Sequence, residues 1–385
     1  MPLSRELGGA RVQLELAQQW QAQGHHVESF DVHQAFPPTT TQTPVLLRNN
    51  LRRPAFAQRA RAYVQAQGHR FDIIDAHQGN LPFTKQELGF NGLLVTRSVG
   101  LYPFYSLFNR QIQAQQGFKA RCWGSFSNWR DRHQSTDCWR SYQTCDLLNL
   151  PNPDEKVYLD RHLQTQTKSH VFPFGLTAIR AQQLAQAPDA SKTEPPTVVF
   201  IGTWGRRKGS GDWARIITTI RQTLPKTQFR FLGTGVSKDV IYRDLTRTPG
   251  VDLTGLTVIP QYTSADLPQL LTGATVGAFP TYVEGFGFAV LEKLAAGIPT
   301  VAYAAAGPKM MLRGFEPDCL VPIGDAIALA QRLLTILQLP PTSYQALARQ
   351  AQARAGQFRW ETIATETLET YQAALANLGE GGFES

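Results

Sequence analysis

Cysteine is scarce in this chain of 385 residues: it occurs four times, and no two copies form a Cys-x-x-Cys pair. Structural zinc sites need such closely spaced ligands, so the sequence argues against a zinc protein and favours a reduced, cytoplasmic one. No apolar run approaches the roughly 20 residues of a membrane-spanning helix. The opening MPLSRELGG carries charge where a signal peptide is apolar. We therefore expect a chain that does not span a membrane.

Phosphate-loop and nucleic-acid motifs are also lacking. No Gly-x-x-x-x-Gly-Lys-Ser/Thr loop occurs, and the Gly-Thr-Gly triplet at 233–235 alone is weak evidence for any site. Lys and Arg outnumber Asp and Glu by 38 to 30, and the net charge of +8 favours anionic partners such as nucleic acid, acidic lipid or phosphorylated ligands. Because the basic residues form no recognisable nucleic-acid motif, a nucleic-acid binder is the least favoured class.

The chain does contain two runs of alternating strand and helix patterns. In the first half, strands are predicted at 26–31, 71–77, 91–96, 145–150 and 170–174. After the Pro-containing stretch DASKTEPP the alternation restarts, with strands at TVVFIG, FRFLGTG, TVGAFP and PTVAY and another near Val251. The length exceeds what one hydrophobic core usually supports. We therefore expect an α/β fold of two facing, doubly wound, Rossmann-like domains.

The expected boundaries are a first domain over 1–178, a linker over 179–195, a second domain over 196–360 and a C-terminal helix, 361–385, that returns to the first domain. One element is unexpected. A doubly wound domain begins with a strand that leads into its first Gly-rich loop, yet Gly8 and Gly9 follow seven residues without a strand pattern. The first strand of the N-terminal domain is therefore predicted to be missing.

The most specific segment is FPTYVEGFGFAVLEKLAAGIPTVAY, residues 279–303. Glu284 follows a strand, Gly285 and Gly287 let backbone N–H groups approach a ligand, and the next helix points its N-terminus at that ligand. Glu292, eight residues later, places a second carboxylate near the first, where it can accept hydrogen bonds from vicinal hydroxyls. This arrangement suits phosphate and sugar hydroxyls better than it suits an ordinary acidic helix terminus.

A second segment, VVFIGTWGRRKGSGDW at 198–213, repeats the order of strand, Gly-containing loop and helix. Arg206, Arg207 and Lys208 would face a diphosphate held at the other helix N-terminus. Taken alone, a solvated basic turn explains this segment equally well. Beside the Glu284 loop, the phosphate interpretation is favoured.

Together these segments resemble the glycosyltransferase group 1 family, whose members are retaining enzymes with two facing Rossmann-like domains of the GT-B type. The resemblance runs over nearly the whole chain, from the Gly8-Gly9 helix through 202–209, 233–235 and 280–297 to FRWETIATETLETY. Its most specific element is the pair Glu284-x7-Glu292 within its EGFG context.

The resemblance implies a role for each of these residues. Glu292 would hold the ribose hydroxyls, and Glu284 would bind the transferred sugar together with nearby N–H groups. Lys208 and an arginine would neutralise the diphosphate leaving group in place of a metal ion. Consistently, no Asp-x-Asp triplet occurs in the chain. The implied donor-binding residues are Gly202, Thr203, Arg206, Gly285, Phe286, Gly287, Phe288 and Glu292, and the implied catalytic residues are Glu284, Lys208 and Arg207.

Two positions depart from the family pattern. Thr203 stands where the family often has Arg or Ser, so the phosphate contact has to come from Arg206 or Arg207. Val99, in TRSVG, stands where many members have a His before Gly close to the donor sugar. His77, at a strand end in DAHQGN, is a candidate acceptor-side residue, as are Gly8 and Gly9. A lone histidine is, however, more often a structural residue.

Aromatic side chains alternate with arginine and lysine over residues 101–142. Two interpretations stay open. The favoured one is that these helices pack on the first domain with their arginines outside. The other is a surface that stacks on an acceptor or makes a peripheral contact with the anionic inner face of a membrane.

The function predicted from the sequence is transfer of a sugar from a nucleotide-diphosphate-sugar to a carbohydrate or lipid-linked acceptor, with retention of configuration and with neither a metal nor another cofactor. The first domain would bind the acceptor, the second the donor, and closure would assemble the site. Two alternatives stay open: a sugar-nucleotide 2-epimerase, and a degenerate homologue that binds nucleotide-sugar without turnover. The absent strand and Val99 favour the latter. The donor base, the sugar, the acceptor and the oligomeric state are not encoded in these motifs.

Overall fold

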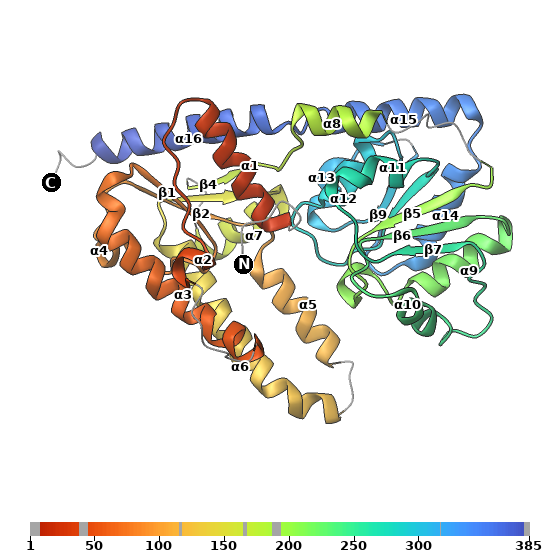
Figure 1. Cartoon of the computed structure of the whole chain (residues 1–385), viewed down its shortest axis with the longest axis horizontal. Helices are drawn as coiled ribbons and strands as arrows, with labels where there is room; N and C mark the ends of the chain where they lie inside the picture. The colour runs from red at the N-terminus through yellow and green to blue at the C-terminus, as the bar shows by residue number, and fades with distance from the viewer. Residues whose placement is uncertain are drawn as a thin grey trace. The chain divides into compact units, whose positions relative to one another are not determined.

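The computed structural model describes residues 8–37, 45–114, 118–164, 168–186, 194–315 and 317–380. Contacts between residues divide the chain into two units. The first unit comprises Met1–Pro173 together with Glu361–Ser385, and the second comprises Phe174–Trp360. Each unit contains one parallel β-sheet between helices (Figure 1). The α/β class expected from the sequence is therefore confirmed.

The sheet of the first unit has four parallel strands in the order β1-β2-β3-β4. They are β1 (Ile73–His77), β2 (Leu93–Arg97), β3 (Leu147–Leu150) and β4 (Ser169–Val171). The strands β2 and β3 are buried along their whole length, as expected for continuous apolar runs covered on both faces. Four of the strands predicted in this half are confirmed, with β4 ending at Val171 rather than at residue 174.

The helices of the first unit are α1 (Gly8–Ala22), α2 (Val32–Ala35), α3 (Val45–Gln67), α4 (Lys85–Leu88), α5 (Tyr102–Ala114), α6 (Phe118–Thr144), α7 (Pro153–Leu163) and nearly all of α16 (Trp360–Glu380). The strand predicted over 26–31 is wrong, because that stretch pairs with no other strand and leads into α2. Asp31 caps α2 by accepting hydrogen bonds from the N–H groups of His33 and Gln34. The predicted absence of an N-terminal strand concerns residues 1–7, which lie outside the described residues.

The C-terminal helix α16 is fixed to the first unit by a buried tyrosine. The Tyr371 hydroxyl donates to Asp75 Oδ2 at 2.8 Å. It also accepts from the Asn149 side-chain amide at 2.8 Å and from the Arg97 guanidinium at 3.0 Å. Arg97 in turn pairs with Asp75. One hydroxyl therefore connects α16 to β1, β2 and β3, and its burial raises the pKa of Tyr371 well above the usual value.

Tyr371→Phe should lower the free energy of unfolding of the first unit by about 1–3 kcal/mol, because it leaves buried polar groups without a partner. Urea denaturation followed by far-UV circular dichroism measures this loss. The matched control is Tyr63→Phe, whose hydroxyl bonds Glu28 in an exposed pair, and which should change the free energy by about 0.5 kcal/mol or less. Equal losses in the two variants would show that the buried network does not stabilise α16.

The sheet of the second unit has six parallel strands in the order β10-β9-β8-β5-β6-β7. They are β5 (Thr197–Ile201), β6 (Gln228–Leu232), β7 (Leu256–Ile259), β8 (Val276–Phe279), β9 (Thr300–Tyr303) and β10 (Leu320–Val321). The strand predicted near Val251 is wrong, because that residue lies in a loop and pairing begins at Leu256. The chain proceeds outward from β5 through β6 to β7 and then returns to β8 on the other side of β5.

This reversal is the switch point of a doubly wound sheet, where ligands usually bind outside the carboxyl ends of the strands. The loops that follow β5 and β8 are therefore adjacent at one edge of the sheet. The helices of the second unit are α8 (Ala178–Ala185), α9 (Trp213–Thr223), α10 (Lys238–Leu245), α11 (Leu267–Leu271), α12 (Phe288–Ala295), α13 (Ala306–Leu312), α14 (Ala326–Leu337) and α15 (Pro341–Ala355). Apart from its first residue, helix α8 lies within 179–195, the stretch expected to be a linker, and it clusters with the second unit.

Candidate functional site

The loops after β5 and β8 bring three of the singled-out side chains together. Lys208, in the short 3-10 helix Arg206–Lys208, bonds the carboxylate of Glu284. The Arg207 guanidinium lies 3.5 Å from the same carboxylate oxygen and donates to the Val283 carbonyl at 3.0 Å. The side chains of Lys208 and Glu284 are only 15% and 16% exposed. The result is a mostly buried ion cluster at the switch point of the sheet.

Two glycines allow this close approach of the loops. Gly209 has φ of +79°, and a Cβ atom there would lie 2.2 Å from the Pro280 carbonyl oxygen. A Cβ atom at Gly307, the second residue of α13, would lie 2.1 Å from the Phe286 carbonyl oxygen. The Gly307 N–H donates to the Glu284 carbonyl at 3.1 Å. Any larger residue at either position would push the loops apart, and Gly307 was not singled out from the sequence.

The charge of Lys208 depends on its partner. Burial lowers the pKa of the Lys208 amine, and the Glu284 carboxylate acts in the opposite direction. Lys208 Nζ also lies 5.1 Å from the centroid of the Phe279 ring at the end of β8, which is within cation–π distance. Glu284 thus offsets part of the effect of burial on the Lys208 pKa at the place where the two loops meet.

Glu292 has a different surrounding from Glu284. It lies within α12, is 7% exposed, and its Oε1 is 3.8 Å from the Arg180 guanidinium of α8. Arg180 was missed in the sequence, because AIRAQQLA carries no glycine, acidic partner or strand signal that would mark it. The two glutamates therefore contact different cations, Lys208 and Arg207 in one case and Arg180 in the other.

The remaining donor-side residues surround this cluster. Gly287 has φ of +98° and caps the N-terminus of α12, while Gly285 and Phe286 are buried and Phe288 is half-buried. Gly202 directly follows β5 and donates from its N–H to the Leu232 carbonyl. The side chains of Thr203 and Arg206 are exposed. Of the three basic residues in this loop, Arg207 and Lys208 turn toward Glu284.

The acceptor-side residues belong to the first unit. Gly8 and Gly9 begin α1, and a Cβ atom at Gly9 would lie 3.3 Å from Val99 Cγ2. The ring Nδ1 of His77 lies 3.0 Å from the Gln78 carbonyl oxygen. The turn that contains Val99 is therefore packed next to the start of α1, whereas His77 makes a local contact at the end of β1.

The Val99 turn is held by a buried carboxyl that the sequence did not reveal. The Ser98 hydroxyl donates to Glu155 Oε2 at 2.7 Å and accepts from the Gly100 N–H at 3.1 Å. Asn152 donates to the other Glu155 oxygen at 3.0 Å. Burial raises the pKa of Glu155 to about 7. Val99, where the resemblance led us to expect a histidine, is thus flanked by a serine that the buried carboxyl holds in place.

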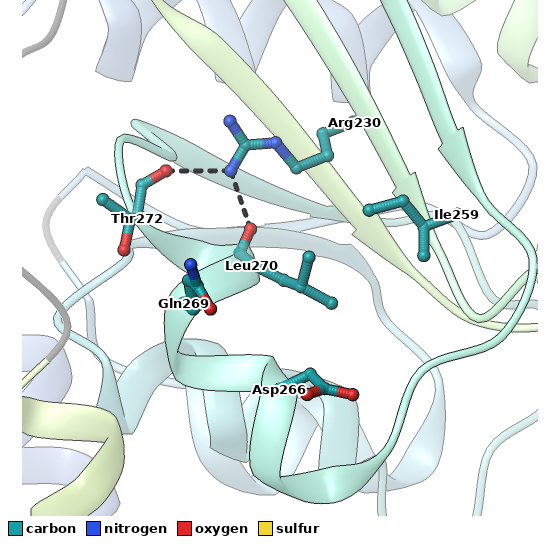
Figure 2. Close-up of a pocket in the computed structure, with 6 residues that line it drawn as sticks. All are labelled: Arg230, Ile259, Asp266, Gln269, Leu270 and Thr272. Carbon is teal, nitrogen blue, oxygen red and sulfur yellow. Dashed lines mark hydrogen bonds between the residues drawn. The ribbon is translucent and has the colours of Figure 1, made fainter.

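A separate hollow of about 450 Å³ lies in the second unit, lined by Arg230, Ile259, Asp266, Gln269, Leu270 and Thr272. Figure 2 shows the Arg230 guanidinium bonded to the carbonyl oxygens of Leu270 and Thr272, at 2.7 and 2.8 Å. One guanidinium nitrogen of Arg230 therefore already donates its hydrogen bonds to carbonyl groups of the protein. None of the donor-side residues at 202–208 and 284–292, all of them described, lines this hollow. We therefore place the candidate site at the ion cluster.

The aromatic and basic stretch forms α5 and α6, which pack against each other and extend beyond the sheet of the first unit (Figure 1). The Tyr102 and Ser106 hydroxyls donate to Asp131, and Trp139 packs against Tyr142 and Tyr158. These contacts favour the packing interpretation for the described part. The side chains of 118–130 lie outside the described residues.

Two features that the described residues lack bear on other classes of protein. No helix among them is both long and apolar enough to cross a bilayer. No group of three or more His, Cys, Asp or Glu side chains in the same part of the chain is placed to hold a metal ion.

Comparison with known proteins gives results that agree with this geometry. The family described as "Glycosyl transferases group 1" matches residues 195–339, which include the whole ion cluster. Glycogen synthase of Mycobacterium tuberculosis (strain CDC 1551 / Oshkosh) is 29% identical over 202 residues, covering 52% of this chain and 47% of that protein. D-inositol 3-phosphate glycosyltransferase of Salinispora arenicola is 30% identical over 209 residues, covering 52% and 46%. The chain thus spans about half the length of the curated relatives it matches.

Solved structures of other proteins have the same fold as this chain. Sucrose-phosphate synthase from Thermosynechococcus elongatus superposes with a TM-score of 0.72 at 22% sequence identity, covering 96% of this chain and 94% of that one. At this identity the likeness establishes the fold, which is the two-domain GT-B architecture expected from the sequence. The family match points to a class of function, which the fold alone does not. Residues 195–339 of this chain match the model of the group 1 glycosyltransferase family.

Proposed function

We propose that this chain transfers a sugar from a nucleotide-diphosphate-sugar to an acceptor hydroxyl, with the donor bound in the second unit. The observation that carries the proposal is the cluster of Lys208, Arg207 and Glu284 at the sheet's switch point. Parallel sheets bind phosphate-bearing ligands at this place. The family match over 195–339 supports the same donor class.

In the proposed reaction, the bond between the sugar C1 and the leaving phosphate oxygen breaks, the acceptor oxygen bonds to C1, and the proton of the acceptor hydroxyl passes to the departing phosphate or to water. Negative charge grows on the departing diphosphate as that bond breaks. The mostly buried Lys208 and the half-buried Arg207 would stabilise it through positive charges that their contacts with the Glu284 loop hold in place. Because two cations serve this purpose, we propose that no metal ion is required, and the family resemblance leads us to propose retention of configuration.

The glutamates would then act on the sugar and the nucleotide. Glu284 would accept hydrogen bonds from the transferred sugar, and Glu292 from the ribose hydroxyls. For the acceptor we propose a carbohydrate or a phosphorylated carbohydrate, on the first unit. The relative named for D-inositol 3-phosphate and the neighbour named sucrose-phosphate synthase support this class, as does the net charge of +8.

A thermal-shift panel of UDP-, ADP- and GDP-sugars tests the donor class. We expect at least one to raise the melting temperature, because a ligand that binds the folded state stabilises it by mass action. With that donor and a panel of carbohydrate acceptors, release of nucleoside diphosphate should continue in excess EDTA. Activity that disappears in EDTA and returns with magnesium or manganese would contradict metal independence. Binding without turnover would favour a degenerate homologue, and conversion of the donor without transfer would favour an epimerase.

A further inference from the structure

A fully buried lysine lies directly beneath the ion cluster. Lys293 follows Glu292 on α12 and is 0% exposed. Its Nζ donates to the Ala278 carbonyl in β8 at 3.0 Å. The absence of a side chain at Gly277 makes room for it, since a Cβ atom there would lie 2.7 Å from Lys293 Cδ. The lysine stem thus passes from α12 to β8, the strand that leads into the Glu284 loop.

Lys293 and Lys208 meet at the same aromatic ring. Lys293 Nζ is 5.4 Å from the centroid of the Phe279 ring, and Lys208 Nζ is 5.1 Å from it. Lys208 has Glu284 as its counter-charge. Among the described residues, no carboxylate forms an ion pair with Lys293. A buried amine without a counter-charge is costly to protonate.

The protonation of the Lys293 amine therefore depends on its burial and on nearby charges. Burial lowers the pKa of Lys293 to about 7, and the positive charge of Lys208 acts in the same direction. Ionisable groups on the other elements around α12 have contacts of their own: Arg180 of α8 with Glu292, Arg354 of α15 with the Met311 carbonyl, and Tyr303 of β9 with Asp212. Lys208 is the charged group that acts on Lys293, and it is also the proposed phosphate ligand.

We propose that Lys293 is a positioning residue coupled to the donor site: it takes up a proton when an anionic diphosphate binds beside Lys208. This inference rests on the proposed function. The bound anion would offset the repulsion between the two amines, so that the charged form of Lys293 becomes favourable. The site would then present a further positive charge, beside those of Lys208 and Arg207, held in place by the Ala278 carbonyl and the Phe279 ring.

Calorimetry of the full chain tests this coupling. UDP-glucose is titrated at neutral pH in buffers that differ in ionisation enthalpy, with ADP-glucose and GDP-mannose as replacements. A nucleotide-sugar is the right probe because its diphosphate, esterified at both ends, does not itself titrate near neutrality. We expect the wild-type protein to take up a sizeable fraction of one proton per bound donor. Lys293→Met should abolish this uptake, whereas Lys238→Met, at an exposed position on α10, should leave it unchanged.

The pH dependence of wild-type affinity gives a second measurement that needs no variant. Because the proton is taken up on binding and the free Lys293 has a pKa of about 7, the donor should bind more tightly as the pH falls toward 7, by at most about tenfold per pH unit, the limit for one proton. Below pH 7 the gain should level off, because the free protein already carries the proton. Donor binding without proton uptake, or uptake that persists in Lys293→Met, would overturn the role of Lys293 and leave the proposed function intact. No binding of any of the three nucleotide-sugars would overturn both.

Discussion

Lys208→Met should lower kcat/KM for sugar transfer by about 100- to 1000-fold, the range seen when one preorganised donor to a developing negative charge is removed. The structure places Lys208 where this effect is large. Its amine is mostly buried and oriented by Glu284, so it loses little solvation when the leaving group departs. Initial-rate kinetics with the donor found in the thermal-shift panel measure the change.

The control for Lys208 is Arg206→Ala. Arg206 is the first residue of the same short helix, but its side chain is exposed. A solvated charge contributes little through screened interactions, so this variant should keep its activity within a few-fold of the wild type. Comparable losses in the two variants would show that the segment acts as a diffuse basic surface rather than through one oriented amine.

Removing Lys208 also leaves the Glu284 carboxylate with Arg207 as its remaining cation. Loss of one partner of a buried pair is destabilising, so the melting temperature of Lys208→Met has to be measured alongside its kinetics. A folded variant with reduced kcat and little change in donor affinity would assign Lys208 to the leaving group. A variant that unfolds at the assay temperature would instead show a structural role for the ion pair.

The sequence predicted the central parts of this fold because local signals and the tertiary structure agree there. TVVFIG and TVGAFP are continuous apolar runs that end in loop residues, and they form β5 and β8. Parallel strands end at the same edge of the sheet, so the meeting of the loops that follow them was predictable. The predicted strands at 26–31 and near Val251 were wrong because a short apolar pattern does not specify a pairing partner.

The parts of the site that the sequence did not reveal depend on contacts between distant segments. Arg180 meets Glu292 across more than one hundred residues of chain, and Glu155 meets Ser98 across 57. Lys293 stands in a helix pattern where a lysine suggests a solvated face, yet it is fully buried. Only the packed structure shows that each of these charged groups has exchanged water for specific partners.

The two glutamates of the family motif should respond differently to mutation. Glu292→Ala should weaken the binding of both free nucleoside diphosphate and intact donor, by roughly 1.5–3 kcal/mol for a lost hydrogen bond to a charged group. Glu284→Gln keeps the shape of the side chain but removes the counter-charge of Lys208. It should leave diphosphate binding nearly intact and lower turnover, since the proposed contact of Glu284 is with the ring on which charge develops.

Calorimetry with nucleoside diphosphate and with intact donor, on both variants, separates these outcomes. Asp239→Asn, a change at an exposed acidic residue of α10, is the control and should alter neither binding nor turnover. Because Glu292 lies beside the buried Arg180, Glu292→Gln is a second variant that keeps the side-chain volume there. Like Glu292→Ala, it should weaken the binding of both ligands. If Glu284→Gln and Glu292→Ala show the same small losses for both ligands, the carboxylates serve only the start of α12. That outcome would favour a binding protein without turnover over a transferase.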